Sequence, residues 1–239
     1  MCGRYVLPDE DDLGEVGATS TRCGGARLLP RFNVAPTTQV PMVVRAQDGA
    51  RELRMARWGL IPDWWKNEKP PILTFNARSE EAAEKPMWKK SFRSQRCLMP
   101  ARGWFEWNEN ESIRGVSGRK TNQPYFLFCP QAKCIAFAGL WSLWERLGEE
   151  SILTCALLSK AAAPSLTYIH HRMPVVLRPE DADAWLDSMT PVSECARLVA
   201  EARQDVVGHP ISPRVNSVQQ DDAGLIEKVQ VANRQMELL

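Results

Sequence analysis

The sequence has few histidines, no CxxC pair and no long apolar run. The three histidines are His170, His171 and His209, and none has the spacing of a zinc site, so we expect no metal and no cofactor. The absence of about 18 consecutive apolar residues argues against a membrane-spanning helix. The acidic segment 8–12 lacks the basic and apolar regions of a signal peptide. These absences argue against assigning this sequence to the membrane, zinc-dependent or secreted proteins.

An excess of charge of one sign is also missing. The 239 residues include 30 Lys and Arg and 29 Asp and Glu, a net charge of +1. Binding to nucleic acid would therefore need a local basic patch. The seven cysteines form no CxxC, and their odd number favours reduced thiols in a cytoplasmic protein. Nothing in the pattern indicates an oligomer, and we expect a monomer.

Strand patterns dominate the chain, with helical patterns between them and near the end. No linker or repeat divides the sequence, so we expect one domain over residues 1–239. Its predicted class is α+β, with a curved, mostly antiparallel, barrel-like sheet flanked by helices. We predict a helix beginning at an N-cap on Ser79 and two more over 179–186 and 193–203. The predicted strands cover 39–45, 52–58, 72–75, 97–107, 125–129, 135–141, 152–158 and 173–177.

Cys2 is the most informative residue. Removal of Met1 would leave Cys2 with a free α-amine and a thiol, whose pKa values are about 8 and about 8.5. These two nucleophiles have the spacing that closes a five-membered thiazolidine ring on an aldehyde, and the second attack would be intramolecular. The alternative is that Cys2 is an ordinary small residue after a start methionine.

Glu106 lies among aromatic residues in the segment 103–107 (GWFEW). In a strand, Trp104 and Glu106 would share one face while Phe105 and Trp107 share the other. A carboxylate in such surroundings would have a raised pKa, suited to general acid–base catalysis. The alternative is an edge-strand glutamate with its carboxylate in water.

Two further segments carry polar groups that suit a reactive site. If residues 74–78 are extended, Asn76 and Arg78 share a face just before a helix, where an anion would bind. If the segment around His170 and His171 is extended, its histidines point to opposite sides, so one of them faces a pocket and can transfer protons. Turn and surface positions are the alternative for all four side chains.

A tryptophan-rich loop follows residue 58. Trp64 and Trp65 stand beside Lys66, a combination that can stack unpaired bases while the lysine meets phosphate. Lysines and arginines between residues 85 and 96 could extend this surface. Alternatively, the tryptophans belong to the core and the basic residues form a solvated helix face.

The order of these motifs resembles the SRAP (SOS-response-associated peptidase) family of abasic-site-processing proteins. The resemblance runs from residue 1 to about 177, with a vaguer match near residues 209–216. It rests on MCGRY (1–5), RFNVAPT (31–37), WGLIP (58–62), NARSE (76–80), GWFEW (103–107) and IHHRMP (169–174).

The resemblance implies a covalent reaction with single-stranded DNA in the DNA damage response. Cys2, freed of Met1 by self-processing, would capture the aldehyde of an abasic site as a thiazolidine crosslink. The imine route would also permit lyase-like strand cleavage. Asn76 would orient the reacting groups, Glu106 would act as general acid–base, and His170 would assist opening of the sugar. The DNA-binding positions implied by the family are Arg4, Asn33, Pro36, Trp64, Trp65 and Arg78. The protein would be bacterial and cytoplasmic, and associated with the nucleoid when bound to DNA.

Two other functional classes remain open. One is an N-terminal cysteine hydrolase or peptidase, which needs an oxyanion hole and no surface for DNA. The other is a non-catalytic reader of modified or single-stranded DNA, which needs the aromatic loop and not Cys2.

Overall fold

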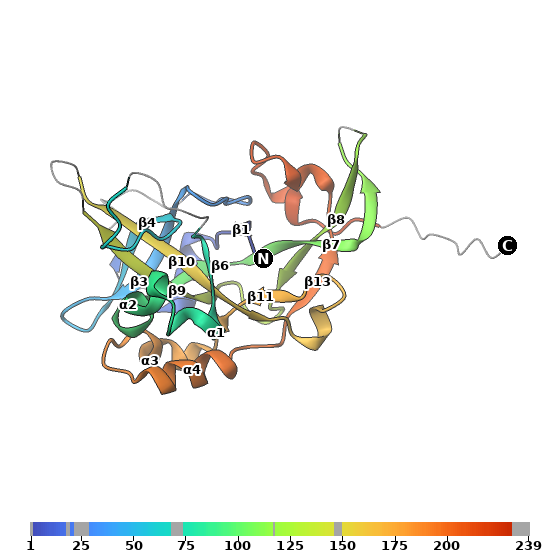
Figure 1. Ribbon diagram of the computed structural model, residues 1–239. Coiled ribbons are helices and arrows are strands. Elements are labelled where there is room, and N and C mark those ends of the chain that lie inside the picture. Colours follow the sequence, from blue (N-terminus) through green and yellow to red (C-terminus); the bar gives the residue numbers. More distant parts are fainter. Residues whose placement is uncertain are drawn as a thin grey trace.

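The described residues of the computed structural model form two β-sheets and four short α-helices (Figure 1). The structure describes residues 2–17, 20–21, 29–67, 74–116, 118–145 and 150–230. Among these residues, no helix is long and apolar enough to cross a membrane. The helices are α1 (Ser79–Ala82), α2 (Pro86–Ser94), α3 (Ala182–Leu186) and α4 (Val192–Ala200), with 3-10 turns η1 (Glu10–Val16), η2 (Pro164–Leu166), η3 (Pro179–Asp181), η4 (Pro213–Asn216) and η5 (Ala223–Ile226).

The larger sheet has nine strands in the order β11-β10-β4-β3-β6-β9-β12, with β2 on β4 and β5 on β10. The sheet curls so far that β9 and β10 also pair. Because β3 and β6 share a single register pair, it is a curled sheet and not a regular closed barrel. The strands are β2 (Ser20–Thr21), β3 (Gln39–Arg45), β4 (Arg51–Trp58), β5 (Asn76–Arg78), β6 (Arg96–Ala101), β9 (Ile135–Trp144), β10 (Ile152–Ala161), β11 (Arg172–Pro174) and β12 (Val176–Leu177). The predicted α+β class with a curved, mostly antiparallel sheet is confirmed.

The smaller sheet is antiparallel, in the order β1-β7-β8-β13. Its strands are β1 (Tyr5–Val6), β7 (Gly103–Arg114), β8 (Lys120–Phe128) and β13 (Val207–Pro210). The prediction of a single strand over 97–107 is wrong. The strand is interrupted at Arg102, where the chain passes from one sheet to the other. Residues 96–101 pair with β9 in the larger sheet, whereas β7 pairs with β8.

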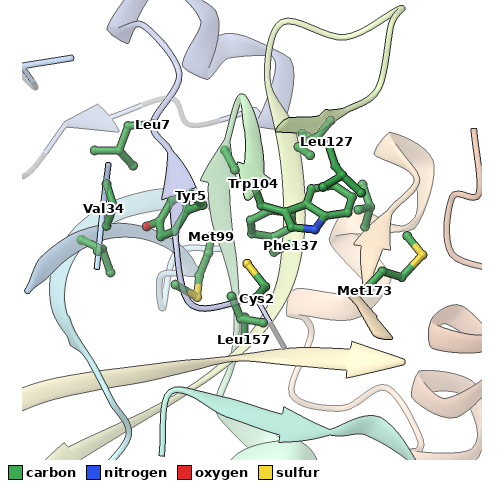
Figure 2. Close-up of a cluster of buried hydrophobic side chains, with 14 of the residues drawn as sticks. Cys2, Tyr5, Leu7, Val34, Met99, Trp104, Leu127, Phe137, Leu157 and Met173 are labelled. Atoms are coloured by element: carbon green, nitrogen blue, oxygen red, sulfur yellow. The ribbon is translucent and has the colours of Figure 1, made fainter. Parts of the chain in front are cut away.

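Three apolar clusters result from this arrangement. The first fills the space between the sheets and contains Cys2, Tyr5 and Trp104 (Figure 2). The second lies on the face of the larger sheet that the helices cover. The third lies behind the smaller sheet and contains Phe105, with Trp107 packed against it. The predicted alternation of faces along 103–107 is therefore confirmed for its aromatic residues.

The predicted boundaries of several elements differ from those in the structure. Residues 72–73 of the predicted strand 72–75 lie outside the described residues, and Thr74 and Phe75 belong to no strand. The strand β5 begins at Asn76 instead. Arg78, and not Ser79, occupies the N-cap of α1, without a side-chain capping bond. The helix predicted over 193–203 begins one residue earlier and ends at Ala200.

Gly103 provides a test of the crossover between the sheets. A Cβ at this position would overlap the carbonyl oxygen of Leu127 and lie 2.6 Å from Cζ of Phe126. We expect Gly103→Ala to lower the free energy of unfolding by about 1–3 kcal/mol, since neighbouring backbone must move. Urea denaturation measures the change.

Gly14→Ala is the matched control, because no atom lies within 4 Å of its added Cβ. We expect it to be neutral or slightly stabilising. Equal stability of the Gly103→Ala variant and the parent would contradict the close approach at β7.

Candidate active site around Cys2

Cys2 lies in the apolar interior between the two sheets, beside Met99, Leu157 and Trp104 (Figure 2). Its side chain is 1% exposed, and its Sγ contacts the Arg4 carbonyl at 3.6 Å. Burial, reinforced by the negative charge of Glu106, raises the pKa of the Cys2 thiol well above its usual value. A partly ionised thiol, which the free amino acid would give, is therefore the wrong expectation. The thiol is protonated at neutral pH and needs a base to react.

Asn76 holds the backbone of Cys2. Its Nδ2 donates to the Cys2 carbonyl at 2.7 Å. The position follows from the pairing of β5 with β10, in which Asn76 is opposite Leu157. Its Oδ1 is buried and finds no hydrogen-bond partner within the described part of the chain. An oriented amide acceptor is thus available beside Cys2.

Glu106 projects from β7 on the same strand face as Trp104 and is 2% exposed. Burial raises its pKa to about 7. At neutral pH the carboxyl group is therefore divided between its acid and carboxylate forms, so it can both give and accept a proton. The alternative of an edge glutamate with its carboxylate in water is wrong.

His170 stands next to Glu106, with Nε2 3.9 Å from the Glu106 Oε2. The Nδ1 atom of His170 lies 2.9 Å from the backbone amide and 3.0 Å from the backbone carbonyl of Arg172, so the backbone holds Nδ1 and Nε2 faces Glu106. Burial lowers the pKa of His170, so the neutral ring prevails at pH 7. The side chain is 9% exposed, which separates it from an ordinary surface histidine.

The neighbouring His171 does not point to the opposite side, as an extended segment would require. Its ring stacks on that of His170 with a centroid distance of 4.4 Å and an interplanar angle of 22°. The reason is a turn, in which the amide of His170 donates to the carbonyl of Leu166. The expectation that one histidine faces the interior still holds, since His171 is exposed.

Arg4 and Asn33 form a second group, two residues from Cys2. The Arg4 Nη1 donates to the Asn33 Oδ1 at 2.8 Å and to the Val215 carbonyl at 2.9 Å. Asn33 is 2% exposed, and its Nδ2 contacts the carbonyls of Val215, Ser217 and Gln220. The buried side chain of Asn33 therefore holds the Arg4 guanidinium in place. Arg4 is only half-buried, so the arginine is the residue of this pair that a ligand at the surface can contact.

Trp64 and Trp65 lie apart from Cys2. Their rings contact edge-to-face at 5.7 Å, and Trp64 is 46% exposed. The Trp65 carbonyl accepts from Nε1 of Trp144, which pairs with the first residue of β10, Ile152. Asn76 pairs five residues further along that strand, a separation of about 16 Å. The tryptophan pair thus marks one end of β10 and the Cys2 group its middle.

Two further DNA-binding candidates occupy the surface near these groups. Arg78 is exposed on β5, where it pairs with Ser159. Pro36 is half-buried in the turn before Thr37, whose amide donates to the Trp58 carbonyl at 2.7 Å. Neither residue contributes to the buried group of Cys2, Asn76, Glu106 and His170.

Arg172 and Tyr125 are parts of the site that the motif analysis did not single out. Arg172 orients His170 through its amide, while its guanidinium pairs with Glu80 at 2.7 Å and donates to the Ser159 carbonyl at 2.6 Å. Tyr125 is the cross-strand partner of Glu106. Arg172 lies inside a motif and could have been found there, but the register of β7 with β8 has no local signal.

The fold and this group together define a class: α+β proteins in which the second residue, a cysteine, is buried between two sheets beside a carboxylate. The family model described as SOS response associated peptidase (SRAP) matches residues 1–218. The chain belongs to the SRAP family.

Curated relatives cover nearly all of the chain. The abasic site processing protein YoqW of Bacillus subtilis is 31% identical over 95% of this chain and 99% of its own. YedK of Escherichia coli, also named an abasic site processing protein, is 33% identical over 96% of this chain and 100% of its own. HMCES of Gallus gallus, with the same description, is 31% identical over 82% of this chain and 65% of its own.

Solved structures share the fold. A Bacteroides thetaiotaomicron protein superimposes with a TM-score of 0.76 at 19% identity, over 96% of this chain and 100% of its own. A Bordetella bronchiseptica protein reaches a TM-score of 0.72 at 22% identity, over 88% and 100%. At these identities the match establishes the architecture alone.

The buried Glu106 predicts a pH dependence of stability. Its pKa is about 7 in the folded state against 4.5 for the free side chain, so between these values the folded protein binds the extra proton. Stability contributed by this group is therefore lost as pH rises from about 4.5 through 7, by about 3 kcal/mol in total. We expect Glu106→Gln to remove this loss in urea denaturation between pH 5 and pH 8.

Glu80→Gln is the control. Its pairing with Arg172 lowers the pKa of Glu80, so that its contribution is lost only as pH falls below the usual value of 4.5. The Glu80→Gln difference from the parent should be constant from pH 5 to pH 8. A constant difference for Glu106→Gln as well would contradict the buried, proton-binding carboxyl.

Asn33 predicts a second, pH-independent effect. Asn33→Ala leaves three carbonyls and the Arg4 guanidinium short of a partner, so we expect a loss of roughly 2–4 kcal/mol in the free energy of unfolding. Asn110→Ala, at an exposed position of β7, should change stability by less than about 0.5 kcal/mol. Similar urea midpoints for the two variants would show that the Asn33 network does not stabilise the fold.

Proposed function

We propose that this protein processes abasic sites by forming a covalent thiazolidine between Cys2 and the aldehyde of the site in single-stranded DNA. The observation that carries the proposal is the meeting of Cys2, Asn76, Glu106 and His170 from four distant segments in one group, in which Cys2 and Glu106 are buried and Asn76 and His170 are partly buried. Such a group supplies a nucleophile, an orienting amide and two proton carriers. The names of the relatives support abasic DNA as the substrate.

The first step is removal of Met1, which exposes the Cys2 α-amine. We propose that the same group assists this hydrolysis, as the family description of a peptidase suggests. The amide of Asn76 holds the Cys2 carbonyl during the step and keeps the new N-terminus in place.

Sugar opening comes next. Glu106 in its acid form gives its proton to the ring oxygen as the bond between this oxygen and C1 breaks, and the neutral ring of His170 accepts the proton of the C1 hydroxyl at Nε2. Return of this proton from His170 to Glu106 through a water between the two groups, whose Nε2 and Oε2 are 3.9 Å apart, restores both. A neutral histidine and a carboxyl group with a pKa of about 7 suit this exchange.

Crosslinking follows in two bond-forming steps. The α-amine attacks the aldehyde carbon, and Glu106 protonates the departing hydroxyl, which leaves as water and gives an imine. The Cys2 sulfur then attacks the imine carbon while its proton passes through Glu106 to the nitrogen, which closes the ring. Because the thiol pKa is raised, ring closure depends on this base. The imine also offers β-elimination as a lyase-like side reaction.

The DNA strand would be held by residues around the buried group. Arg4 and Arg78 meet phosphates, Trp64 and Trp65 stack bases, and Pro36 packs against the backbone. Asn33 acts through Arg4. Association should weaken as salt concentration rises, because each neutralised phosphate releases counterions.

Intact-mass spectrometry with single-stranded DNA carrying one abasic site tests the proposal. We expect protein lacking Met1 to gain the mass of the DNA minus one water, in a heat-stable adduct. Cys2→Ser keeps the amine, so it should form an imine that borohydride traps but no stable ring. Cys2→Ala should also keep an amine and give the same trappable imine.

Protein that lacks Met1 and yields no adduct would overturn the covalent mechanism. Retained binding without an adduct would favour a non-catalytic reader, and cleavage of an amide substrate without DNA binding would favour a cysteine hydrolase. Heat-stable adducts with Cys2→Ala would move the nucleophile to another residue.

A further inference from the structure

The groups of the candidate site lie in sequence along strand β10. Its first residue pairs with Trp144, which binds the Trp65 carbonyl. Its middle, at Leu157, pairs with Asn76. Its last residue, Ala161, pairs with Arg172, and the turn that carries His170 joins the two strands. The tryptophan pair and this turn therefore lie on opposite sides of Cys2.

That turn carries an exposed aromatic residue, Tyr168. Of the large apolar side chains that are exposed in the described part of the chain, only Trp64 and Tyr168 are aromatic, at 46% and 52% exposure. One therefore stands at each end of β10. Tyr168 is two residues from His170, so its backbone is fixed by the turn that positions the histidine.

Tyr125 supports the Tyr168 ring from the interior. The two rings meet edge-to-face at 6.1 Å and 87°. Tyr125 is 6% exposed, belongs to the apolar cluster around Cys2 and is the cross-strand partner of Glu106. Its hydroxyl donates to Oε2 of Glu111 at 2.8 Å. Tyr168 thus rests on a ring that is held rigidly at the wall of the buried group.

The charges near Tyr168 favour the base of a nucleotide over its phosphate as the group that binds there. A β-bulge between Asn108 and Ser112 takes residues 109–111 out of register, and these include Glu109 and Glu111. Glu111 is directed to Tyr125. Two carboxylates disfavour a phosphate at this place, whereas a half-exposed ring offers a surface for stacking a base.

We propose that Tyr168 stacks on the base of a nucleotide next to the abasic site, on the side away from Trp64 and Trp65. The inference rests on the proposed function and adds a substrate feature to it. An abasic nucleotide has no base of its own, so the neighbouring bases must supply the stacking. The protein therefore requires a base on the Tyr168 side for efficient capture.

A cycle of changes in protein and DNA tests the proposal. The probes are single-stranded oligonucleotides with one abasic site, in which the adjacent nucleotide on the 5′ or 3′ side keeps its base or is replaced by a tetrahydrofuran spacer. The second-order rate constant of adduct formation is measured for the parent and for Tyr168→Ala. For the parent, we expect loss of the base on one of the two sides to lower this constant about tenfold.

For Tyr168→Ala, the constant should already be about tenfold lower with the intact strand, and loss of that base should change it no further. Tyr168→Phe keeps the ring and should behave as the parent. Met189→Ala, at a residue 84% exposed on another surface, controls for loss of an exposed apolar side chain. Thermal melting checks that all variants fold.

Additive effects of the protein and DNA changes on both sides, or an unchanged rate constant for Tyr168→Ala, would overturn the proposal. Failure of the covalent mechanism is distinguishable, because then no variant, the parent included, forms an adduct with any strand.

Discussion

The site depends on the removal of Cys2 and Glu106 from water. Both are buried, and Cys2 belongs to an apolar cluster that contains side chains of β1, β7 and β10. Desolvation disfavours the charged form of each group, so the resting site holds a neutral thiol and a carboxyl group with a pKa of about 7. A thiolate in water would react with many electrophiles. In the proposed mechanism, the buried thiol reacts only where the Glu106 carboxyl group can take its proton.

Burial of polar groups has a cost in stability, and part of this cost falls on a side chain that contacts Cys2. Buried polar atoms without a hydrogen-bond partner in the described residues include Tyr5 Oη, Trp104 Nε1, Asn76 Oδ1 and Thr74 Oγ1. Tyr5 and Trp104 belong to the same apolar cluster as Cys2, and Thr74 is two residues from Asn76. Each such atom costs about 1–3 kcal/mol when it stays unpaired. Among these four residues, Asn76 contacts Cys2, and a buried acceptor without a partner beside a reactive group is an atom that a bound substrate would pair.

Sequence patterns predict what depends on neighbours along the chain. The strands at 39–45 and 52–58 and the alternation of Trp104 with Phe105 follow from local periodicity, and the structure agrees. Features set by distant contacts could not be predicted. The break at Arg102 arises because β6 and β7 have different partners, and the burial of Asn33 arises from carbonyls near residue 215. The motifs identify the residues of the candidate site, but the raised thiol pKa and the turn at His170 come only from packing.

The pairing of β10 with its neighbouring strands fixes the order of the candidate site residues along the surface. The strand pairs with β4, β5, β9 and β11, so groups from four parts of the chain are fixed relative to one backbone. Side chains alternate between faces of a strand, and a shift of β5 by one residue would turn Asn76 away from Cys2. Because backbone pairing sets the order, exposed residues at the strand ends can vary without disturbing the buried group. The exposed residue Tyr168 can therefore be exchanged while Cys2, Asn76, Glu106 and His170 keep their geometry.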